Sequence, residues 1–170
     1  RAEAGIYSHR IGDKWLVGGA SNSGGAVLKT FFSSDELAHL SARIDPTVPS
    51  PLHYYPLPAR GERFPDNDPD KAPVMAPRPD DDVAFLHGLL EGIARIEQQG
   101  YERLAELGTG YPQRVISSGG GSVNATWSAI RARVLGVPVV RAGQAEAAYG
   151  AARLARQALL PIKLRQHLLR

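Results

Sequence analysis

The chain has 170 residues, of which 43% are hydrophobic and 22% charged, and this composition is typical of one soluble folded domain rather than a disordered segment. It contains no cysteine, which excludes disulfides and thiolate metal sites and agrees with a reducing, cytoplasmic location. No apolar run is long enough to cross a membrane, no amino-terminal signal-peptide pattern is present, and the net charge of +3 does not by itself indicate nucleic-acid binding.

The charge is unevenly distributed. From Ala147 to the carboxyl end there are no acidic residues. The basic residues of that segment include Arg153, Arg156, Lys163, Arg165 and Arg170. A solvated terminal helix is one interpretation, and a partner surface or anion contact is the other. Because the chain begins at Arg1 and enters a strand pattern almost at once, we expect it to be a fragment or a processed piece of a longer protein.

The amino-terminal segment predicts a β-hairpin followed by a glycine-rich loop. Residues 6–11 and 14–17 have strand composition and flank a Gly-Asp turn signal. The sequence GGASNSGG occupies residues 18–25, and a helical run begins at Ala26. Glycines allow close backbone approach, so this loop is able to hold phosphate through its N–H groups, although it lacks the Lys-Ser/Thr ending of a P-loop. The alternative is a hairpin that simply runs into a helix cap.

A second helix is predicted from Ser33 or Ser34 to about Ile44. Glu36 follows Ser33 at the spacing of a capping box, and an Asp-Pro pair ends the pattern. Residues 53–55 are then a candidate for a short strand.

Residues 56–79 form a long proline-rich segment, and a loop of this length is usually functional or mobile. Its carboxylates Glu62, Asp66 and Asp68 are a cluster that invites an acid/base or metal interpretation. We favour a structural role instead, in which an internal Glu–Arg pair and Asx turns hold the loop.

The longest helix is predicted from the acidic residues 80–82, whose charge favours a helix amino terminus, to Gly108. Leucines and isoleucines follow at helical spacing. His87 and Glu91 lie one turn apart, but no third ligand is near them in the sequence, so a metal site is not expected.

The sequence RVISSGGGSVNATW, at residues 114–127, reads as a strand, a glycine turn and a helix start. Ser122 is the expected N-cap, and free N–H groups at a helix start favour anions. Asn124 and Trp127 share one helix face, so one is placed to hydrogen-bond a nucleotide and the other to stack on its base. The alternative is a glycine-rich connector with Trp127 in the core.

Residues 137–140 then form a second apolar strand, and residues 144–156 an alanine-rich helix able to approach its neighbours closely. Pro161 ends that helix, and residues 162–169 form a basic amphipathic tail. The order of these elements predicts an α/β fold, with a mixed sheet and helices on both faces, in a single domain over residues 1–170.

Five motifs occur in an order that is more specific than any one of them. They are GG-x-x-N-x-GG at 18–25, GER-x-P at 61–65 followed by Asp-Pro, LLEGIA at 89–94, GGG-S-x-N at 119–124 and Ala-Tyr-Gly-Ala-Ala at 148–152. In that order they resemble the carboxyl-terminal domain of the FGGY carbohydrate kinases, particularly the D-ribulose and xylulose kinases. The resemblance covers nearly the whole chain and implies an actin-like, ribonuclease H-like ATPase fold.

The resemblance also implies which residues bind ATP. The expected nucleotide-binding residues are Gly24, Gly25, Gly120, Gly121, Ser122, Asn124 and Trp127. Of these, Gly120, Gly121 and Asn124 match the family's adenosine-binding motif, and Ser122 falls inside it. Trp127 stands where a ribulose-kinase-like member would stack the adenine, and Gly24 matches a glycine near the phosphates. Leu28 stands where some relatives carry a polar residue. The matching residues of the Gly61–Pro65 motif are expected to be structural, near a domain cleft.

The implied activity is transfer of the ATP γ-phosphoryl group, with Mg²⁺, to a hydroxyl of a pentulose such as D-ribulose or D-xylulose. The family's Asp-x-Gly-Thr motif is absent here, so the catalytic base is expected in the amino-terminal half, and no catalytic or metal-binding residue is expected in this chain. The expected partners are that half and the sugar, with a homodimer as a further option and no nucleic acid or membrane.

Two other functions compete with this one. The first is a non-catalytic nucleotide-binding module of actin-like fold, which would bind ATP without gaining activity with any partner. The second is a self-contained hydrolase that uses Glu62, Asp66 and Asp68 with a metal. The GER-x-P motif argues against the module, because a generic nucleotide domain has no reason to carry it.

Overall fold

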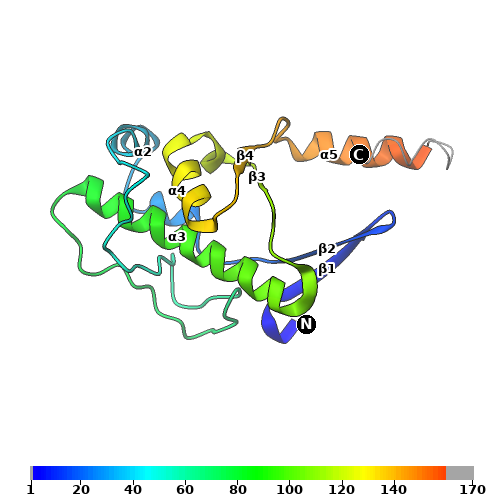
Figure 1. Ribbon diagram of the computed structural model, residues 1–170, viewed down its shortest axis with the longest axis horizontal. Coiled ribbons are helices and arrows are strands. Elements are labelled where there is room, and N and C mark those ends of the chain that lie inside the picture. The colour runs from blue at the N-terminus through cyan, green and yellow to red at the C-terminus, as the bar shows by residue number, and fades with distance from the viewer. Residues whose placement is uncertain (1, 160–170) are drawn as a thin grey trace.

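The computed structural model describes residues 2–159, and its central element is the long helix α3 (Asp82–Leu104). Asp81 caps α3 by accepting a hydrogen bond from the Val83 N–H, as the acidic start of the pattern predicts. Helices α2 (Ser34–Ser41) and α4 (Ala125–Leu135) both pack on α3 (Figure 1). None of the helices between residues 2 and 159 is long and apolar enough to cross a membrane.

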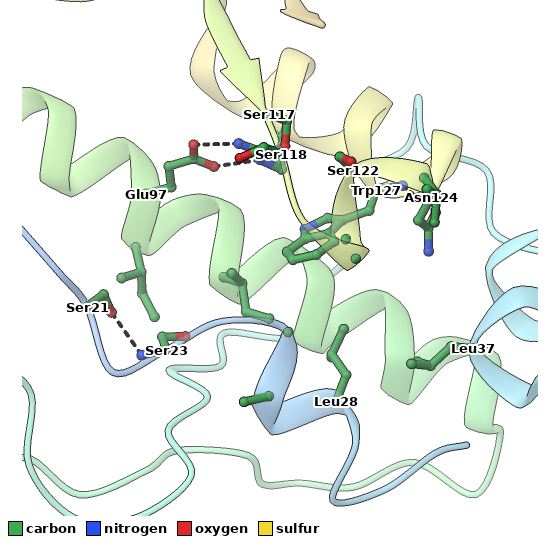
Figure 2. A pocket seen from close by; sticks show the side chains of 18 of the residues that line it. Ser21, Ser23, Leu28, Leu37, Glu97, Ser117, Ser118, Ser122, Asn124 and Trp127 are labelled. Carbon is green, nitrogen blue, oxygen red and sulfur yellow. Dashed lines mark hydrogen bonds and ion pairs between the residues drawn. The ribbon is translucent and has the colours of Figure 1, made fainter. Parts of the chain in front are cut away.

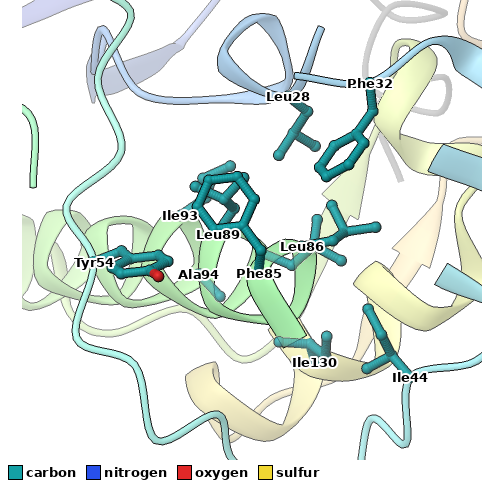
Figure 3. Packing of buried hydrophobic residues seen from close by; sticks show 11 residues of the cluster. Leu28, Phe32, Ile44, Tyr54, Phe85, Leu86, Leu89, Ile93, Ala94 and Ile130 are labelled. Carbon is teal, nitrogen blue, oxygen red and sulfur yellow. The ribbon is translucent and has the colours of Figure 1, made fainter. Parts of the chain in front are cut away.

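The core forms along one face of α3. Phe85, Leu89 and Ile93 recur at helical spacing, and Ile130 reaches them from α4 (Figure 3). Phe31, after the first helical turn, packs edge-on against Phe85 with ring centroids 5.1 Å apart. The apolar periodicity of the sequence therefore marks the buried face correctly.

Glycines on α3 let the proline-rich segment lie directly against the helix. A Cβ added at Gly92 would come within 2.7 Å of the Tyr54 carbonyl oxygen, and one at Gly100 within 2.8 Å of the Phe64 ring. These close approaches explain why glycine stands at position 92, within LLEGIA, and at position 100, two turns later, in a helix that mostly carries larger residues.

The strands form two separate pairs rather than one continuous mixed sheet within the described residues. Strands β1 (Ile6–Ile11) and β2 (Lys14–Gly19) form the predicted antiparallel hairpin, with Tyr7 opposite Gly18. Strands β3 (Val115–Ser117) and β4 (Val139–Arg141) pair in parallel around the α4 crossover. Both pairing types of a mixed α/β fold are therefore present.

Several element boundaries differ from the predictions. α2 ends at Ser41 rather than Ile44, α3 passes into a π-helical turn, η2 (Ala105–Thr109), and α5 spans Ala147–Leu159 rather than residues 144–156. The expected strand at residues 53–55 is a single bridge between Tyr55 and Val74. The remaining short helical turns are η1 (Ala2–Ala4), α1 (Gly25–Leu28) and η3 (Gly120–Val123).

The alanine-rich helix α5 does not make the close contacts that its small residues predict. It extends away from the helices around α3, and its side chains from 147 to 156 are exposed (Figure 1). The predicted tail at 162–169, with Pro161, Lys163, Arg165 and Arg170, lies outside the described residues.

Candidate nucleotide site

A cavity of about 1200 Å³ lies between two glycine-rich loops that are about 100 residues apart in the sequence. One wall is the loop between β2 and α1, and the opposite wall is the loop between β3 and α4 (Figure 2). Side chains of α3, including Ile93 and Glu97, form part of its lining, and Leu37 and Ser41 of α2 contribute as well. The volume is large enough for a small-molecule ligand.

The structure brings together six of the seven residues predicted to bind nucleotide. The cavity lining includes Gly25, Gly120, Gly121, Ser122, Asn124 and Trp127. Gly24, the seventh, is the N-cap of α1 and has φ 153°, a backbone conformation that favours glycine. Leu28 also lines the cavity. Nucleotide binding by these residues remains a prediction, although their convergence on one cavity agrees with it.

Trp127 joins the two loops. Its indole ring lies about 4.0 Å from the position that a Cβ of Gly25 would take, and a Cβ at Gly121 would overlap the ring. The side chain is half-buried, packs against the core and also lines the cavity. Its Nε1 is buried and has no hydrogen-bond partner among the described residues. The two alternative roles of Trp127, in the core and at the site, are therefore not exclusive.

The N-cap of α4 is Asn124 rather than Ser122. Asn124 Oδ1 accepts from the Trp127 N–H at 2.9 Å, and its Nδ2 donates to Ser41 Oγ at 2.8 Å. Ser122 is buried and donates its hydroxyl to the Gly119 carbonyl at 2.7 Å, inside the preceding turn η3. One donor and one acceptor of the Asn124 amide are thus used within the protein, so this side chain shapes the loop, and its second N–H and second oxygen lone pair remain available to a ligand.

Glu62 fastens the first glycine loop to the proline-rich segment. Only 2% of its surface is exposed, and it accepts hydrogen bonds from five donors. These are Asn22 N at 2.6 Å, Ser21 Oγ at 2.7 Å, Arg63 N at 2.9 Å, Tyr55 Oη at 3.2 Å and Phe64 N at 3.5 Å. Burial, with the nearby carboxylate of Glu62 as a second cause, raises the pKa of Tyr55, which therefore remains a hydrogen-bond donor.

The expected carboxylate cluster is not assembled as a reactive site. Glu62 is occupied by its donors, Asp66 pairs with Lys71 at 2.5 Å, and Asp68 Oδ1 accepts from the Asp70 N–H in an Asx turn. The internal Glu–Arg pair predicted for this loop is also wrong, because the Arg63 guanidinium donates to Asn22 at 2.6 Å. No group of three potential metal ligands occurs among residues 2–159.

An ion pair at the cavity wall has no counterpart among the sequence-based predictions. Arg131 on α4 contacts Glu97 on α3 through two hydrogen bonds of 2.7 Å, and its third nitrogen donates to Ser117 Oγ at 2.7 Å. No short-range signal indicates this contact, because the two charged residues are 34 positions apart.

The whole described chain corresponds to one known domain family. Residues 2–159 match the family described as "FGGY family of carbohydrate kinases, C-terminal domain". The chain belongs to this FGGY family. The match confirms the resemblance that the five motifs indicate, and it confirms the expected actin-like fold.

Solved kinase structures are similar to this FGGY chain. A structure described as a xyloylose kinase from Brucella ovis is 25% identical, with a TM-score of 0.72 over 93% of this chain and 34% of its own. A ligand-bound xylulose kinase from Lactobacillus acidophilus is 20% identical, with a TM-score of 0.71 over 91% and 33%. A gluconate kinase from the same organism is 21% identical, with a TM-score of 0.68 over 91% and 33%. The FGGY chain therefore spans about a third of the length of these relatives.

The LLEGIA motif of the FGGY chain contains a buried charge cluster rather than a metal pair. Glu91 is 2% exposed and contacts Arg133 at 2.5 Å and Arg95 at 3.4 Å. Arg133 also donates to the Pro46 carbonyl at 2.8 Å, so the cluster ties α3 and α4 to the segment after α2. His87 Nε2 lies 3.7 Å from Glu91 and is buried without a hydrogen-bond partner among the described residues.

His87 should make stability fall in mild acid. Burial lowers the pKa of His87 below 6.5, Arg133 and Arg95 act in the same direction, and Glu91 only partly opposes them. The unfolded chain therefore binds the proton more readily, and the free energy of unfolding should fall as pH drops from about 6.5 toward the folded-state pKa. Urea unfolding of His87→Gln should show a smaller loss over this interval. An unchanged slope would contradict the role of His87.

Proposed function

We propose that this chain is the nucleotide-binding part of an ATP-dependent sugar kinase that phosphorylates a hydroxyl of a pentulose such as D-ribulose or D-xylulose. The observation that carries the proposal is the convergence of both glycine-rich loops, with Trp127 between them, on one cavity in a chain of the FGGY family. Glycine loops and helix starts present backbone N–H groups to phosphate without obstruction by side chains.

The cavity fits a nucleoside triphosphate better than a free metal ion. The β3–α4 loop and the exposed part of Trp127 are suited to the adenosine, and the loop that ends at Gly25 to the phosphates. Lys29, which follows α1, also lines the cavity and provides a cation. Among the described lining residues Glu97 is the one carboxylate, and Arg131 engages both of its oxygens. Mg²⁺ would therefore enter with the ATP phosphates.

The chemistry requires more than this chain supplies. Phosphoryl transfer depends on alignment of the phosphates, stabilisation of charge and a base that accepts the proton of the sugar hydroxyl. In the proposed enzyme, the residues described above align the nucleotide and exclude water from its adenine. The catalytic base and most sugar contacts come from the amino-terminal half, which is the expected partner.

Fluorescence of Trp127 should report ATP binding directly. The chain has two tryptophans, and Trp15 is 64% exposed on the β1–β2 hairpin. In a Trp15→Phe variant, titration with ATP and Mg²⁺ should therefore change the Trp127 emission in a saturable manner. Calorimetry on the same variant checks the affinity.

The amino-terminal half, supplied as a second polypeptide, should tighten this binding and produce pentulose kinase activity. Binding without activity in the pair would favour the non-catalytic module. Absence of any heat or fluorescence change, with and without the second polypeptide, would disprove the nucleotide site. Pentulose kinase activity of this chain alone would disprove the assignment of the catalytic base to the amino-terminal half.

A further inference from the structure

The β3–α4 loop, residues 118–123, is positioned mainly by contacts of the residues at its two ends. Ser118, Gly119 and Gly120 are exposed, and a Cβ added at either glycine would meet no atom within 4 Å. The hydrogen bonds inside the loop run from Ser122 to the Gly119 carbonyl and therefore stiffen the turn without attaching it to the rest of the protein. Its position relative to the opposite loop must come largely from the flanking residues.

At the carboxyl-terminal end of the loop, Asn124 provides one attachment through Ser41 of α2. At the amino-terminal end, Ser117 provides the other. Its carbonyl accepts from Ala142 N at 2.8 Å, and its hydroxyl accepts from Arg131 at 2.7 Å. The hydroxyl contact matters for the site, because it links the last residue of β3 to the helices on which the cavity is built.

The geometry of Arg131 suits it to this link. Glu97 binds Nε and Nη2, each at 2.7 Å, which leaves Nη1 to donate to Ser117. The side chains are 11% exposed for Arg131 and 22% exposed for Glu97, so the pair is better shielded from water than a surface pair. The guanidinium carbon also lies 5.9 Å from the Trp127 ring centroid. One side chain therefore contacts α3, β3 and the indole.

We propose that Arg131 is a positioning residue for nucleotide binding, held by Glu97 and acting through Ser117 on the β3–α4 loop. The inference rests on the proposed function, since it assigns a role within that nucleotide site. A lysine cannot replace the arginine, because its single ammonium group lacks the planar fork that binds a carboxylate at two points and a hydroxyl at a third.

The test compares Ser117→Ala, Arg131→Lys and the double variant by calorimetric titration of the full chain with ATP and Mg²⁺. Each single variant should weaken ATP binding by about tenfold, the effect of one charge-assisted hydrogen bond. The double variant should be no weaker than Arg131→Lys, because both changes break the same link. Arg103→Lys is the matched control, since its pair with Glu106 is exposed and its binding should equal that of the wild type.

Ser117→Ala keeps the Glu97–Arg131 pair, so its urea midpoint should stay near the wild-type value while ATP affinity falls. A purely structural role predicts the reverse, with a lower midpoint and unchanged affinity of the folded protein. Wild-type affinity in Ser117→Ala and Arg131→Lys, combined with lost affinity in Gly120→Ala, would overturn the positioning role and leave the proposed function standing. Wild-type affinity in all three would overturn the positioning role and remove Gly120 from the site, whereas absence of ATP binding to the wild-type chain would overturn the proposed function itself.

Discussion

Gly121→Ala should lower both the stability and the ATP affinity of the chain, whereas Gly120→Ala should lower the affinity alone. A Cβ at Gly121 would overlap the Trp127 indole, so that ring would have to leave its place between the two glycine loops. Overpacking of this kind costs about 1–3 kcal/mol of unfolding free energy. A Cβ at Gly120 would meet no protein atom within 4 Å, so stability should change by less than about 0.5 kcal/mol.

Comparison of the two alanine variants therefore distinguishes an effect on protein packing from an effect on ligand contact. Gly120 is the position where the resemblance places nucleotide, and its methyl variant tests whether a ligand approaches the backbone there. Urea unfolding gives the stability and calorimetry with ATP and Mg²⁺ gives the affinity. Equal stability losses in both variants would contradict the packing described for Trp127. Undisturbed ATP binding in Gly120→Ala would remove that residue from the site.

Glu62→Ala should be among the most destabilising single substitutions in the chain. It would leave the Asn22 and Arg63 N–H groups without their acceptor in a nearly water-free position and would release the Ser21 and Tyr55 hydroxyls. Buried donors without acceptors cost about 1–3 kcal/mol each, so we expect a loss of about 3 kcal/mol. The loop at residues 18–25 would also lose its two hydrogen bonds to Glu62, and ATP affinity should fall as a result.

Two further variants sharpen this prediction. Glu62→Gln retains one oxygen for the backbone donors and places an amide near the hydroxyls, so its loss of unfolding free energy should be intermediate. Asp66→Ala removes an exposed carboxylate that pairs with Lys71, and its effect should stay below about 1 kcal/mol. If Asp66→Ala proved as costly as Glu62→Ala, the structural role assigned to Glu62 would be wrong. Loss of a catalytic activity in Asp66→Asn would revive the hydrolase interpretation.

The capping and packing signals of the sequence predict local structure well. Ser33 and Glu36 form the expected capping box, with the Ser33 N–H bound to Glu36 at 2.7 Å. The apolar positions of α3 face the core as their spacing requires. These features depend on residues within one or two turns of each other, and their energetics are therefore visible in a short window of sequence.

Long-range polar contacts are not visible in that way. The sequence suggests Ser122 as the cap of α4, whereas in the structure Asn124 caps the helix and also donates to Ser41 on another helix. Glu62 reads as part of an acidic cluster, but the fold surrounds it with donors from a segment about 40 residues away. A carboxylate buried among hydrogen-bond donors holds together the segments that supply those donors, whereas an exposed carboxylate remains available for chemistry.

The sequence by itself determined the α/β class, the core face of the central helix, the family and the two glycine loops, because each of these is encoded in local periodicity or in motif order. Only the tertiary structure decided that the two loops face one cavity, that the Trp127 ring lies between them, and that Arg131 links α3 to the end of β3. The physical reason is that packing and charge pairing act between surfaces brought together by folding, and the partners lie 14 positions apart for Arg131 and Ser117 and 34 for Arg131 and Glu97, beyond the reach of local sequence patterns.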